Sequence, residues 1–411
     1  MTTSQPTGPL KGIRIVDLTA VVLGSFAAQT LGELGADIVK VEAPGGPAAG
    51  GDIMRWAGDT PAGPASGLAP MFMMLNRNKR SVTLDLKSAA GHEALAALLR
   101  TADVFLANRP AAALAKLNLS YEQVRLIKSD IVYVNAPGYG SAGPYGDFPA
   151  YDELIQAGSG GADMMPRTYE GTPPRYLPTL IADKTVGMYL AQAALAGIVH
   201  KLRTGEGQSI EVPMLECMTY FNLSENLYGH SFDPPLGTYG YVRIHTPHRR
   251  PYRTSDGWIA ISPYSDRNWR DFFALVGREA QFLADERFAT YQKRIKNIDV
   301  LYSMMEEMTV QKTSQEWFEA CAAKNIPCMH VRRFEELSED PHLKTVGLFE
   351  KRRHSVAGGI QDVRHPVTYS RTPAAWHREQ PVLGAHTRDV LREAGLTADD
   401  IDRLAADGAF G

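Results

Sequence analysis

The sequence predicts an α/β protein whose first part is an open, parallel sheet and whose second part is a smaller α+β domain. Three observations support this prediction. Strand-like and helix-like segments alternate over the first ~210 residues, which is typical of a sheet covered by helices. The chain has 411 residues, which is more than one ordinary core accommodates. Its last segments again resemble a strand followed by helices, which is compatible with a return to the first domain.

The first three elements set the direction of the sheet. Residues 12–19 ("GIRIVDLT") and 38–44 ("IVKVEAP") have the composition of buried strands, and residues 24–37 between them have that of a short helix. A strand, a helix and a strand within ~35 residues form a βαβ unit, whose strands are parallel. The same alternation continues with a strand at 80–87, a helix at 91–102 and a strand at 103–108, and residues 130–140 predict a further strand that runs into a glycine-rich turn.

The second half of the chain has a different pattern. A turn-rich stretch leads to a predicted strand at 258–262, and helix-like stretches follow at 267–275 and 297–309. "SQEWFEACAAKNIPCMHV" then predicts a helix followed by a strand, and "HPVTYSRTP" (365–373) predicts another strand before the terminal helices. We therefore expect three parts: a large domain over 1–225, a small α+β domain over 226–330, and a return segment over 331–411.

Composition narrows the function classes. The net charge of −3 and the pI near 6.4 disfavour a nucleic-acid or membrane-surface role. No apolar run reaches the ~20 residues that span a bilayer, and "MTTSQPTGPLKG" lacks the pattern of a signal peptide. Three scattered cysteines, Cys217, Cys321 and Cys328, predict neither a disulfide framework nor a zinc site. We expect a cytoplasmic protein without a metal.

The loops after the strands do not match a nucleotide fingerprint. Gly24 follows the first strand without a GxGxxG pattern, and no GxxxxGK[ST] occurs, so NAD and P-loop interpretations fail. "GYGSAGPYG" (138–146) is either a structural turn or a ligand loop. Lys79 and Arg80 in "NRNKRS" are either solvated surface cations or anion ligands at a strand boundary.

Taken together, five segments resemble the class III CoA-transferases, which include formyl-CoA and carnitine CoA-transferases and the related α-methylacyl-CoA racemases. In order, they are "GIRIVDLTAVVLG…LGELGADIVKVEAPGG…GDIMR", "LNRNKRSVTLDLK" with "ADVFLANRP", "NAPGYGSAGPYGDFPAYD", "ADKTVG…ALAGIVHKLRTGEGQSIEVPMLE" and "LGAHTRDVLREAGL". The resemblance implies a Rossmann-like large domain built from both chain ends, a small domain inserted between them, and an interlocked homodimer.

Asp183 has a local interpretation and a second one from the resemblance. Locally it is an N-cap, because it precedes a helix-like run that ends at Gly205. The resemblance places the family's nucleophilic carboxylate at the aspartate of "ADKTVG". The two are compatible, since backbone N–H donors and the positive helix end would keep the carboxylate ionised for attack. Gly187 and Gly197, with neighbouring alanines, predict a thin helix that packs closely against other backbone.

The chemistry implied by the resemblance is covalent CoA transfer. Asp183 attacks an acyl-CoA to give a mixed anhydride and then an aspartyl-CoA thioester, and an incoming carboxylic acid reverses the steps. Backbone N–H groups of Gly138 and Gly140 are expected to stabilise the tetrahedral oxyanions. Coenzyme A would enter only as acyl-CoA substrate, and by family position its binding residues are Val22, Leu23, Arg55, Leu75, Asn76, Lys79, Asn108, Lys116, Gly138, Tyr139 and Gly140. For Arg55 a surface ion pair is the alternative.

Departures from the family patterns restrict the reaction. The racemases carry a His at the position of Tyr151 and a Glu near Pro263 and Tyr264, and racemisation needs a base and an acid on opposite faces of Cα. The formyl-CoA:oxalate enzymes carry a Gln at Val22 and a four-glycine run where this chain has "LGTYGYVRIH". Transfer to an acid other than oxalate is therefore favoured, with an acyl-CoA racemase as the first alternative.

A basic stretch in the small domain bears on the substrate. It brings together Arg243, His245, His248, Arg249, Arg250 and Arg253. Such a cluster could hold a small dicarboxylate or another acidic acyl group, or it could face solvent or the partner subunit. A third class of function is a catalytically silent CoA-binding protein, although the presence of Asp183 argues against it.

Overall fold

The computed structural model describes residues 7–46 and 50–411. The first six of the twelve residues that argue against a signal peptide therefore lie outside the described residues. The chain divides into two compact units. Unit 1 comprises the residues up to Ser159, Leu177–Tyr220 and His342–Gly411, and unit 2 comprises Gly160–Tyr176 and Phe221–Pro341.

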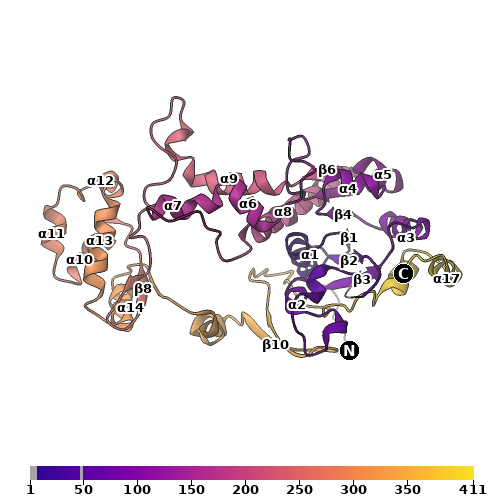
Figure 1. Ribbon diagram of the computed structural model, residues 1–411. Helices are drawn as coiled ribbons and strands as arrows, with labels where there is room; N and C mark the ends of the chain where they lie inside the picture. Colours follow the sequence, from indigo (N-terminus) through magenta and orange to yellow (C-terminus); the bar gives the residue numbers. More distant parts are fainter. Residues whose placement is uncertain (1–6, 47–49) are drawn as a thin grey trace. The chain divides into compact units, whose positions relative to one another are not determined.

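Unit 1 is built on a six-stranded parallel sheet with the order β3-β2-β1-β4-β5-β6 (Figure 1). The sheet is parallel because each predicted strand is followed by a crossover, most often through a helix. The order reverses between β1 and β4, which creates a topological switch point at the carboxyl ends of these two strands. The strands are β1 (Arg14–Asp17), β2 (Asp37–Glu42), β3 (Lys79–Thr83), β4 (Val104–Ala107), β5 (Val132–Asn135) and β6 (Gln208–Glu211).

Five of these strands match predicted segments, although β2 and β3 each begin one residue earlier than predicted, and β6 was missed. Its side chains alternate between half-buried and exposed positions, so it lacks the continuous apolar run that marks the central strands. It pairs with β5 alone and therefore forms an edge of the sheet.

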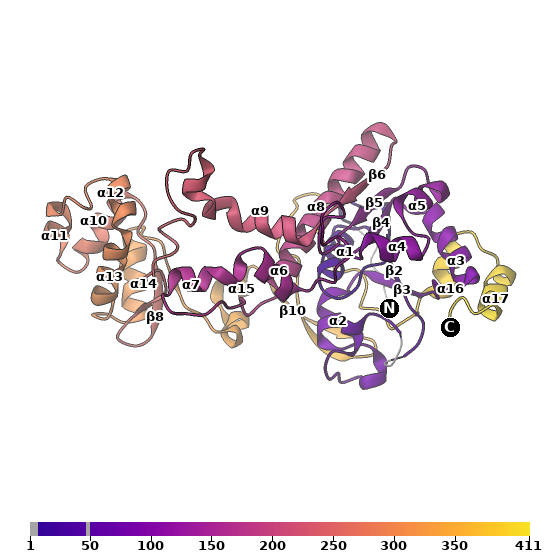
Figure 2. The ribbon, with the colours of Figure 1, turned by 45° about the horizontal axis from the view of Figure 1, so that its top comes forward.

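The core of unit 1 lies on both faces of the sheet. Ile15 packs into one cluster with α1 and α8, whereas the next residue, Val16, packs into another with α3, α5, α16 and α17. Figure 1 and Figure 2 show α1 beside α8 and α3 beside α17. The helices are α1 (Leu23–Glu33), α2 (Pro70–Leu75), α3 (Ala89–Arg100), α4 (Ala111–Lys116), α5 (Tyr121–Ile127), α6 (Asp152–Gly158), α8 (Ile181–Thr204), α16 (Thr387–Glu393) and α17 (Ala398–Ala406).

The C-terminal segment contains one wrong prediction and one confirmed prediction. The strand expected at 365–373 is irregular, because Pro366 and Pro373 supply no N–H and no neighbouring strand pairs with it. Instead, a hairpin forms just before it, from β10 (Phe349–His354) and β11 (Gly358–Val363). The terminal helices are confirmed as α16 and α17.

Unit 2 is a small antiparallel sheet packed against helices. Its strands are β7 (Tyr252–Arg253), β8 (Trp258–Ile261) and β9 (Cys328–His330), in that order. Its helices are α7 (Met164–Thr168), α10 (Asp266–Ala274), α11 (Glu279–Ala284), α12 (Tyr291–Lys296), α13 (Ile298–Thr309) and α14 (Ser314–Ala323), while α9 (Met214–Asn226) and α15 (Pro341–Thr345) cross the unit boundaries.

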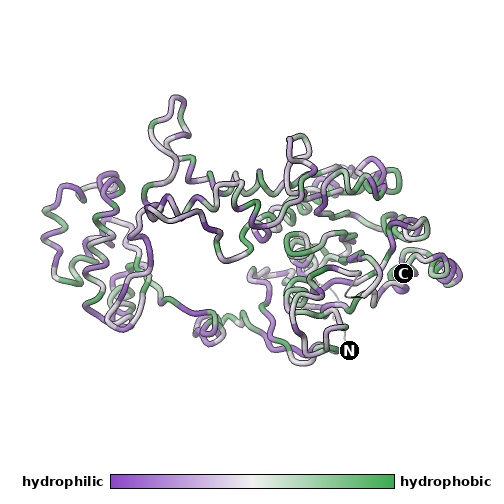
Figure 3. The backbone as a smooth tube through the Cα atoms, viewed as in Figure 1, coloured by the Kyte–Doolittle hydropathy of each residue, from purple (hydrophilic) through white to green (hydrophobic). Residues whose placement is uncertain are grey.

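The two units differ in how apolar residues are distributed. Figure 3 shows hydrophobic residues along the central strands of unit 1, whereas the helices of unit 2 alternate between hydrophilic and hydrophobic positions. An aromatic cluster that includes Trp269, Phe272 and Trp317 forms the core of unit 2. Among the described residues, no helix combines the length and apolar composition that crossing a membrane requires.

Candidate active site

Asp183 lies in the first turn of α8, but it is not the residue that caps the helix. The helix begins at Ile181 with Leu180 as N-cap, so Asp183 is its third residue. The expectation of an N-cap at Asp183 is therefore wrong. Its carboxylate is half-buried, and no hydrogen bond or ion pair to it is found within the described ranges.

The start of α8 is instead capped from another helix. Asp152, a buried residue at the beginning of α6, accepts a hydrogen bond from the backbone N–H of Asp183 at 3.0 Å. One turn later on α6, Gln156 donates to Asp152 and accepts the backbone N–H of Leu177 at 2.8 Å. These contacts fix the segment that leads into α8, and with it the position of Asp183.

This arrangement determines the charge state of Asp183. Burial, followed by the nearby carboxylates of Asp152 and Glu153, raises the pKa of Asp183 to about 7. The expectation that the helix end keeps this acid fully ionised is therefore wrong, because desolvation and like charges oppose ionisation. A carboxylate with a pKa near neutrality is a stronger nucleophile when ionised than one at the usual value.

Helix α8 approaches α1 closely one turn after Asp183. A Cβ at Gly187 would lie 2.8 Å from the carbonyl oxygen of Leu23, so only glycine allows this contact. Residues four apart share a helix face, so Asp183 and the contact with Leu23 lie on the same side of α8. The predicted thin helix is confirmed, and it brings the beginning of α1 beside the turn of α8 that carries Asp183.

The "GYG" loop belongs to the same packing cluster. Tyr139 packs against the apolar cluster that contains Ala182 and Val186 of α8. The N–H of Gly140 donates to the Glu216 carboxylate at 2.9 Å, and a Cβ there would lie 2.4 Å from the same carboxylate. Gly138 is equally confined, since its Cβ would lie 2.1 Å from that of Ala150. The loop is thus held tightly, and the Gly140 N–H already donates its hydrogen bond to Glu216.

A cavity of about 240 Å³ lies at the switch point of the sheet. Its walls come from the segments that follow the carboxyl ends of β1, β2, β3 and β4, which is where open α/β sheets bind nucleotides. Two cationic side chains line it, Lys87 and Arg109. The other lining residues are Leu18, Thr19, Ala20, Val41, Glu42, Ala43, Gly51, Asp52, Leu84, Asp85, Leu86 and Leu117.

Two asparagines shape the rim of this switch point. Asn108 exchanges two hydrogen bonds with the backbone of Ala20, at 2.9 and 3.0 Å. Asn135, one strand further along, makes the same pair of bonds with the backbone of Arg109, at 2.9 and 3.2 Å. Asn108 was predicted to bind CoA. The structure gives it a further task, which is to hold the loop after β1.

Two cations predicted to contact CoA phosphates are buried. The Lys79 ammonium donates to Asn76 at 2.9 Å and to the Ser25 carbonyl at 3.0 Å, and Asp17 lies at 3.3 Å. Burial lowers the pKa of Lys79 to about 8, against the opposing effect of Asp17.

Arg55 is also internal and is not part of a surface ion pair. Its guanidinium makes two hydrogen bonds of 2.7 Å to Glu42 and lies over the ring of Phe72. Direct phosphate binding by Lys79 or Arg55 would require these groups to leave the interior. The remaining predicted CoA residues divide by exposure: Lys116 is exposed, whereas Val22, Leu23, Leu75 and Asn76 are buried.

Residues that the sequence did not single out also contribute to the site. Asp152 could have been found from the resemblance, since it stands in the quoted "AYD" segment. Arg109 directly follows the predicted Asn108, and the rule that ligands bind at the carboxyl ends of parallel strands would have indicated it. Lys87 carries no distinguishing signal in the sequence.

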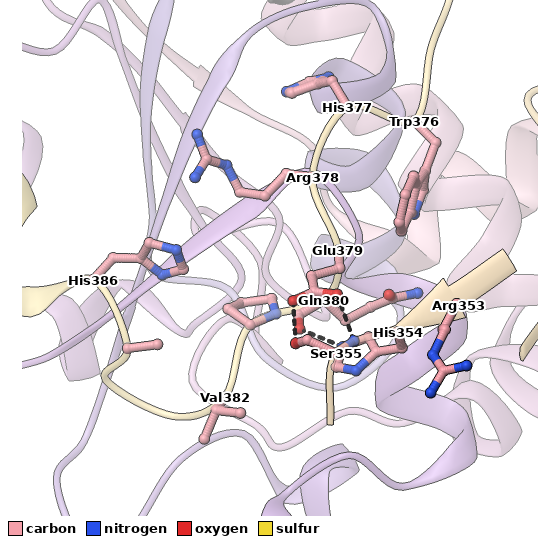
Figure 4. Close-up of a pocket in the computed structure, with 12 residues that line it drawn as sticks. Arg353, His354, Ser355, Trp376, His377, Arg378, Glu379, Gln380, Val382 and His386 are labelled. Carbon is pink, nitrogen blue, oxygen red and sulfur yellow. Dashed lines mark hydrogen bonds between the residues drawn. The ribbon is translucent and has the colours of Figure 1, made fainter. Parts of the chain in front are cut away.

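A second cavity, of about 590 Å³, lies against the returning C-terminal segment (Figure 4). In its wall the Ser355 backbone N–H donates to Glu379 at 2.8 Å, and His354 pairs with the carbonyl of Gln380 at 2.9 Å. Arg378 and His386 also line it. No residue predicted for catalysis or CoA binding borders this cavity.

The described part of the chain contains no group of three or more His, Cys, Asp or Glu residues arranged to hold a metal ion.

Comparisons with known proteins identify the family of this chain. The family model for CoA-transferase family III matches residues 10–387. The chain is 32% identical to a succinate–glutarate CoA-transferase of Agrobacterium fabrum, over 94% of this chain and 95% of the relative. It is 28% identical to the human succinyl-CoA:glutarate CoA-transferase, over 95% and 87%. The crystal structure of Rv3272 from Mycobacterium tuberculosis superposes with a TM-score of 0.79 at 28% identity, over 93% and 99%. The chain therefore belongs to CoA-transferase family III and is an enzyme that transfers CoA between carboxylic acids.

Proposed function

We propose that this enzyme moves CoA between an acyl-CoA donor and a small dicarboxylic acid through covalent intermediates on Asp183. The observation that carries the proposal is the state of Asp183. It is a half-buried carboxylate to which no hydrogen bond or ion pair is found among the described residues, held by Asp152 through its backbone and lying beside the start of α1. Relatives named for succinate and glutarate support a dicarboxylate as substrate.

The proposed reaction consists of acyl transfers at one carboxylate. The ionised Asp183 attacks the thioester carbonyl, forming a mixed anhydride as the C–S bond breaks and CoA thiolate leaves. The thiolate attacks the aspartyl carbonyl, which releases the first acid and leaves an aspartyl-CoA thioester. The second acid attacks this thioester and again forms an anhydride. The released thiolate then attacks the acyl carbonyl of that anhydride, giving the new acyl-CoA and free Asp183.

Each addition produces an oxyanion, for which we propose the backbone of the 138–140 loop as donor. The tight contacts of Gly138 and Gly140 support a loop of fixed shape. In the present arrangement the Gly140 N–H donates to Glu216. That bond would have to open, or be exchanged for one to the oxyanion, when acyl-CoA binds.

We also propose that CoA occupies the switch-point cavity, with the exposed Lys116 and the lining Arg109 near its phosphates. The cavity position and the two cations support this placement. For Val22, Leu23, Leu75, Asn76, Lys79 and Arg55 the buried positions support an indirect role, in which they shape the loops that border the cavity.

The assembly that we propose is a homodimer in which unit 2 acts as an inserted domain. Several large apolar side chains of α8 and α9 are exposed in the single chain, including Met188 (65%), Leu202 (72%) and Tyr220 (70%). Large apolar side chains left exposed in a single chain are expected where a second subunit covers them. Light scattering should therefore give twice the mass of one chain.

The experiment that tests the function compares Asp183→Asn with Asp399→Asn, a matched change at an exposed position in the first turn of helix α17. We expect exchange of CoA between succinyl-CoA and labelled glutarate to fall about 10⁴-fold or more in the first variant and to stay unchanged in the second. Unchanged exchange by Asp183→Asn would contradict the proposal. Exchange of the Cα proton without CoA transfer would indicate a racemase, and binding without either reaction a silent CoA-binding protein.

A further inference from the structure

Unit 2 contains a cavity of its own, of about 470 Å³, beside the sheet β7–β8–β9. Its apolar lining comes mainly from the two antiparallel strands β8 and β9 and the residues next to them. Three arginines from the preceding basic stretch line the same cavity. The lining residues are Arg243, Arg249, Arg250, Pro251, Tyr252, Ala260, Ile261, Ser262, Tyr302, Pro327, Cys328 and Met329. An apolar wall with convergent charged groups is typical of a small-molecule site.

Arg243 is held in place by neutral groups alone. Its Nε donates to the hydroxyl of Tyr302 at 2.9 Å, an Nη2 lies 3.4 Å from the hydroxyl of Ser262, and its guanidinium lies 5.3 Å from the ring centre of Tyr264. The side chain is half-buried, and no carboxylate pairs with it within the described ranges. A partly desolvated guanidinium without a counter-ion favours an anionic ligand.

Its two neighbours in the lining provide a contrast. Arg250 is neutralised, because Glu306 accepts from its Nε at 2.8 Å and also lies 3.0 Å from His248. Arg249 is exposed and has no ion pair among the residues that the structure describes. No Asp or Glu is present in the cavity lining. The cavity therefore carries two uncompensated positive charges, on Arg243 and Arg249.

We propose that this cavity binds the carboxylate of an acidic acyl substrate, with Arg243 as its principal ligand and Arg249 as a second. The inference rests on the proposed function and sharpens it, because it names the part of the chain that recognises a second carboxylate. The guanidinium fork of Arg243 matches a carboxylate in shape and charge, while Ile261 and Met329 provide apolar surface for the methylene chain.

The test uses two acids of equal chain length, glutarate and pentanoate, as CoA acceptors for the full-length enzyme. The wild type should prefer glutarate in kcat/KM. Arg243→Gln should reduce that preference about tenfold to a hundredfold, the usual effect of losing a hydrogen bond to a charged group, by raising KM for glutarate. Turnover of pentanoate should stay within about twofold, because its methyl end carries no charge for Arg243 to bind. Arg253→Gln, in the same basic stretch but outside the cavity lining, is the control.

Two further measurements distinguish a failure of this carboxylate site from a failure of the proposed CoA transfer. Arg249→Gln changes an exposed side chain and should shift the preference in the same direction even if Arg243→Gln does not fold. Calorimetry with free glutarate should show binding to the wild type and to Asp183→Asn, and weaker binding to the Arg243 and Arg249 variants. An unchanged preference and unchanged binding in both variants would overturn the inference and leave the proposed function standing. Binding that depends on Arg243 without any CoA exchange would overturn the function alone.

Discussion

Asp52 and Asp183 are two aspartates of unit 1 in opposite surroundings. Burial alone would raise the pKa of Asp52, but the Lys40 ammonium at 3.0 Å and the N–H groups of Met54 and Val21 hold it below the usual value. Asp183 lacks such partners, and burial with two nearby carboxylates raises its pKa to about 7. The first acid is fixed in one charge state and stabilises a loop. The second is poised between two states and is available for chemistry.

Two arginines, one in each unit, show the same contrast between a paired and an unpaired charge. Arg55 in unit 1 is buried and its charge is matched by Glu42, whereas Arg243 in unit 2 is half-buried and bonded to hydroxyl groups. Satisfied charges are best explained as structural, and unsatisfied charges mark the positions where a ligand is expected.

The largest effect on stability is expected from breaking a matched pair. Arg55→Met leaves Glu42 buried without its cation, which should reduce the free energy of unfolding by about 3–5 kcal/mol. Denaturant unfolding measures this. Arg388→Met removes an exposed ion pair with Asp402 and should change stability by no more than about 1 kcal/mol. Equal small losses in both variants would contradict the structural assignment of Arg55.

The pKa of Asp183 predicts a pH dependence of activity. Because the pKa is raised, the acid is mostly protonated below about pH 7, and only the ionised form attacks. The kcat/KM value should therefore rise about tenfold per pH unit below pH 7 and level off above it. Asp152→Asn removes a negative neighbour, so it should move the bend toward lower pH. If the bend in the pH profile of kcat/KM is at the same pH in Asp152→Asn as in the wild type, a group other than Asp183 controls the activity.

The close contact of α8 with α1 should be sensitive to one added methyl group. Gly187→Ala places a Cβ against the carbonyl of Leu23, and the forced shift should cost about 1–3 kcal/mol in stability. It should also lower kcat, because Asp183 lies one turn away. Gln192→Ala, an exposed change on the same helix, should leave both quantities unchanged. A fully active, stable Gly187→Ala would show that this contact does not position the acid.

The smallest effects are expected at the exposed cations of the switch point. Arg109→Gln and Lys116→Gln should each raise KM for acyl-CoA about two- to fivefold, and less at high salt, since exposed charge pairs are weak and screened. Lys11→Gln, an exposed cation before β1 and thus at the opposite end of that strand, is the control. Salt-independent changes would argue against phosphate contacts.

The sequence predicted the parallel sheet well, because apolar runs bounded by turns mark each central strand. It missed β6, whose alternating half-buried positions resemble a surface loop, and it misplaced the strand near Pro366. Asp183 was singled out as the candidate nucleophile through the resemblance. Its raised pKa could not be predicted, since Asp152 and Glu153 lie about 30 residues earlier and only folding brings them near. The burial of Lys79 and Arg55 likewise depends on partners from distant segments.

The central claim is that Asp183 becomes covalently acylated, and trapping tests it most directly. The enzyme is mixed with succinyl-CoA, quenched with hydroxylamine, and analysed by intact mass and peptide mass spectrometry. An activated aspartyl group should be converted to a hydroxamate at Asp183, in the wild type and in Asp399→Asn but not in Asp183→Asn. Exchange of CoA between acids without any modification of Asp183, or with modification at another residue, would contradict the account.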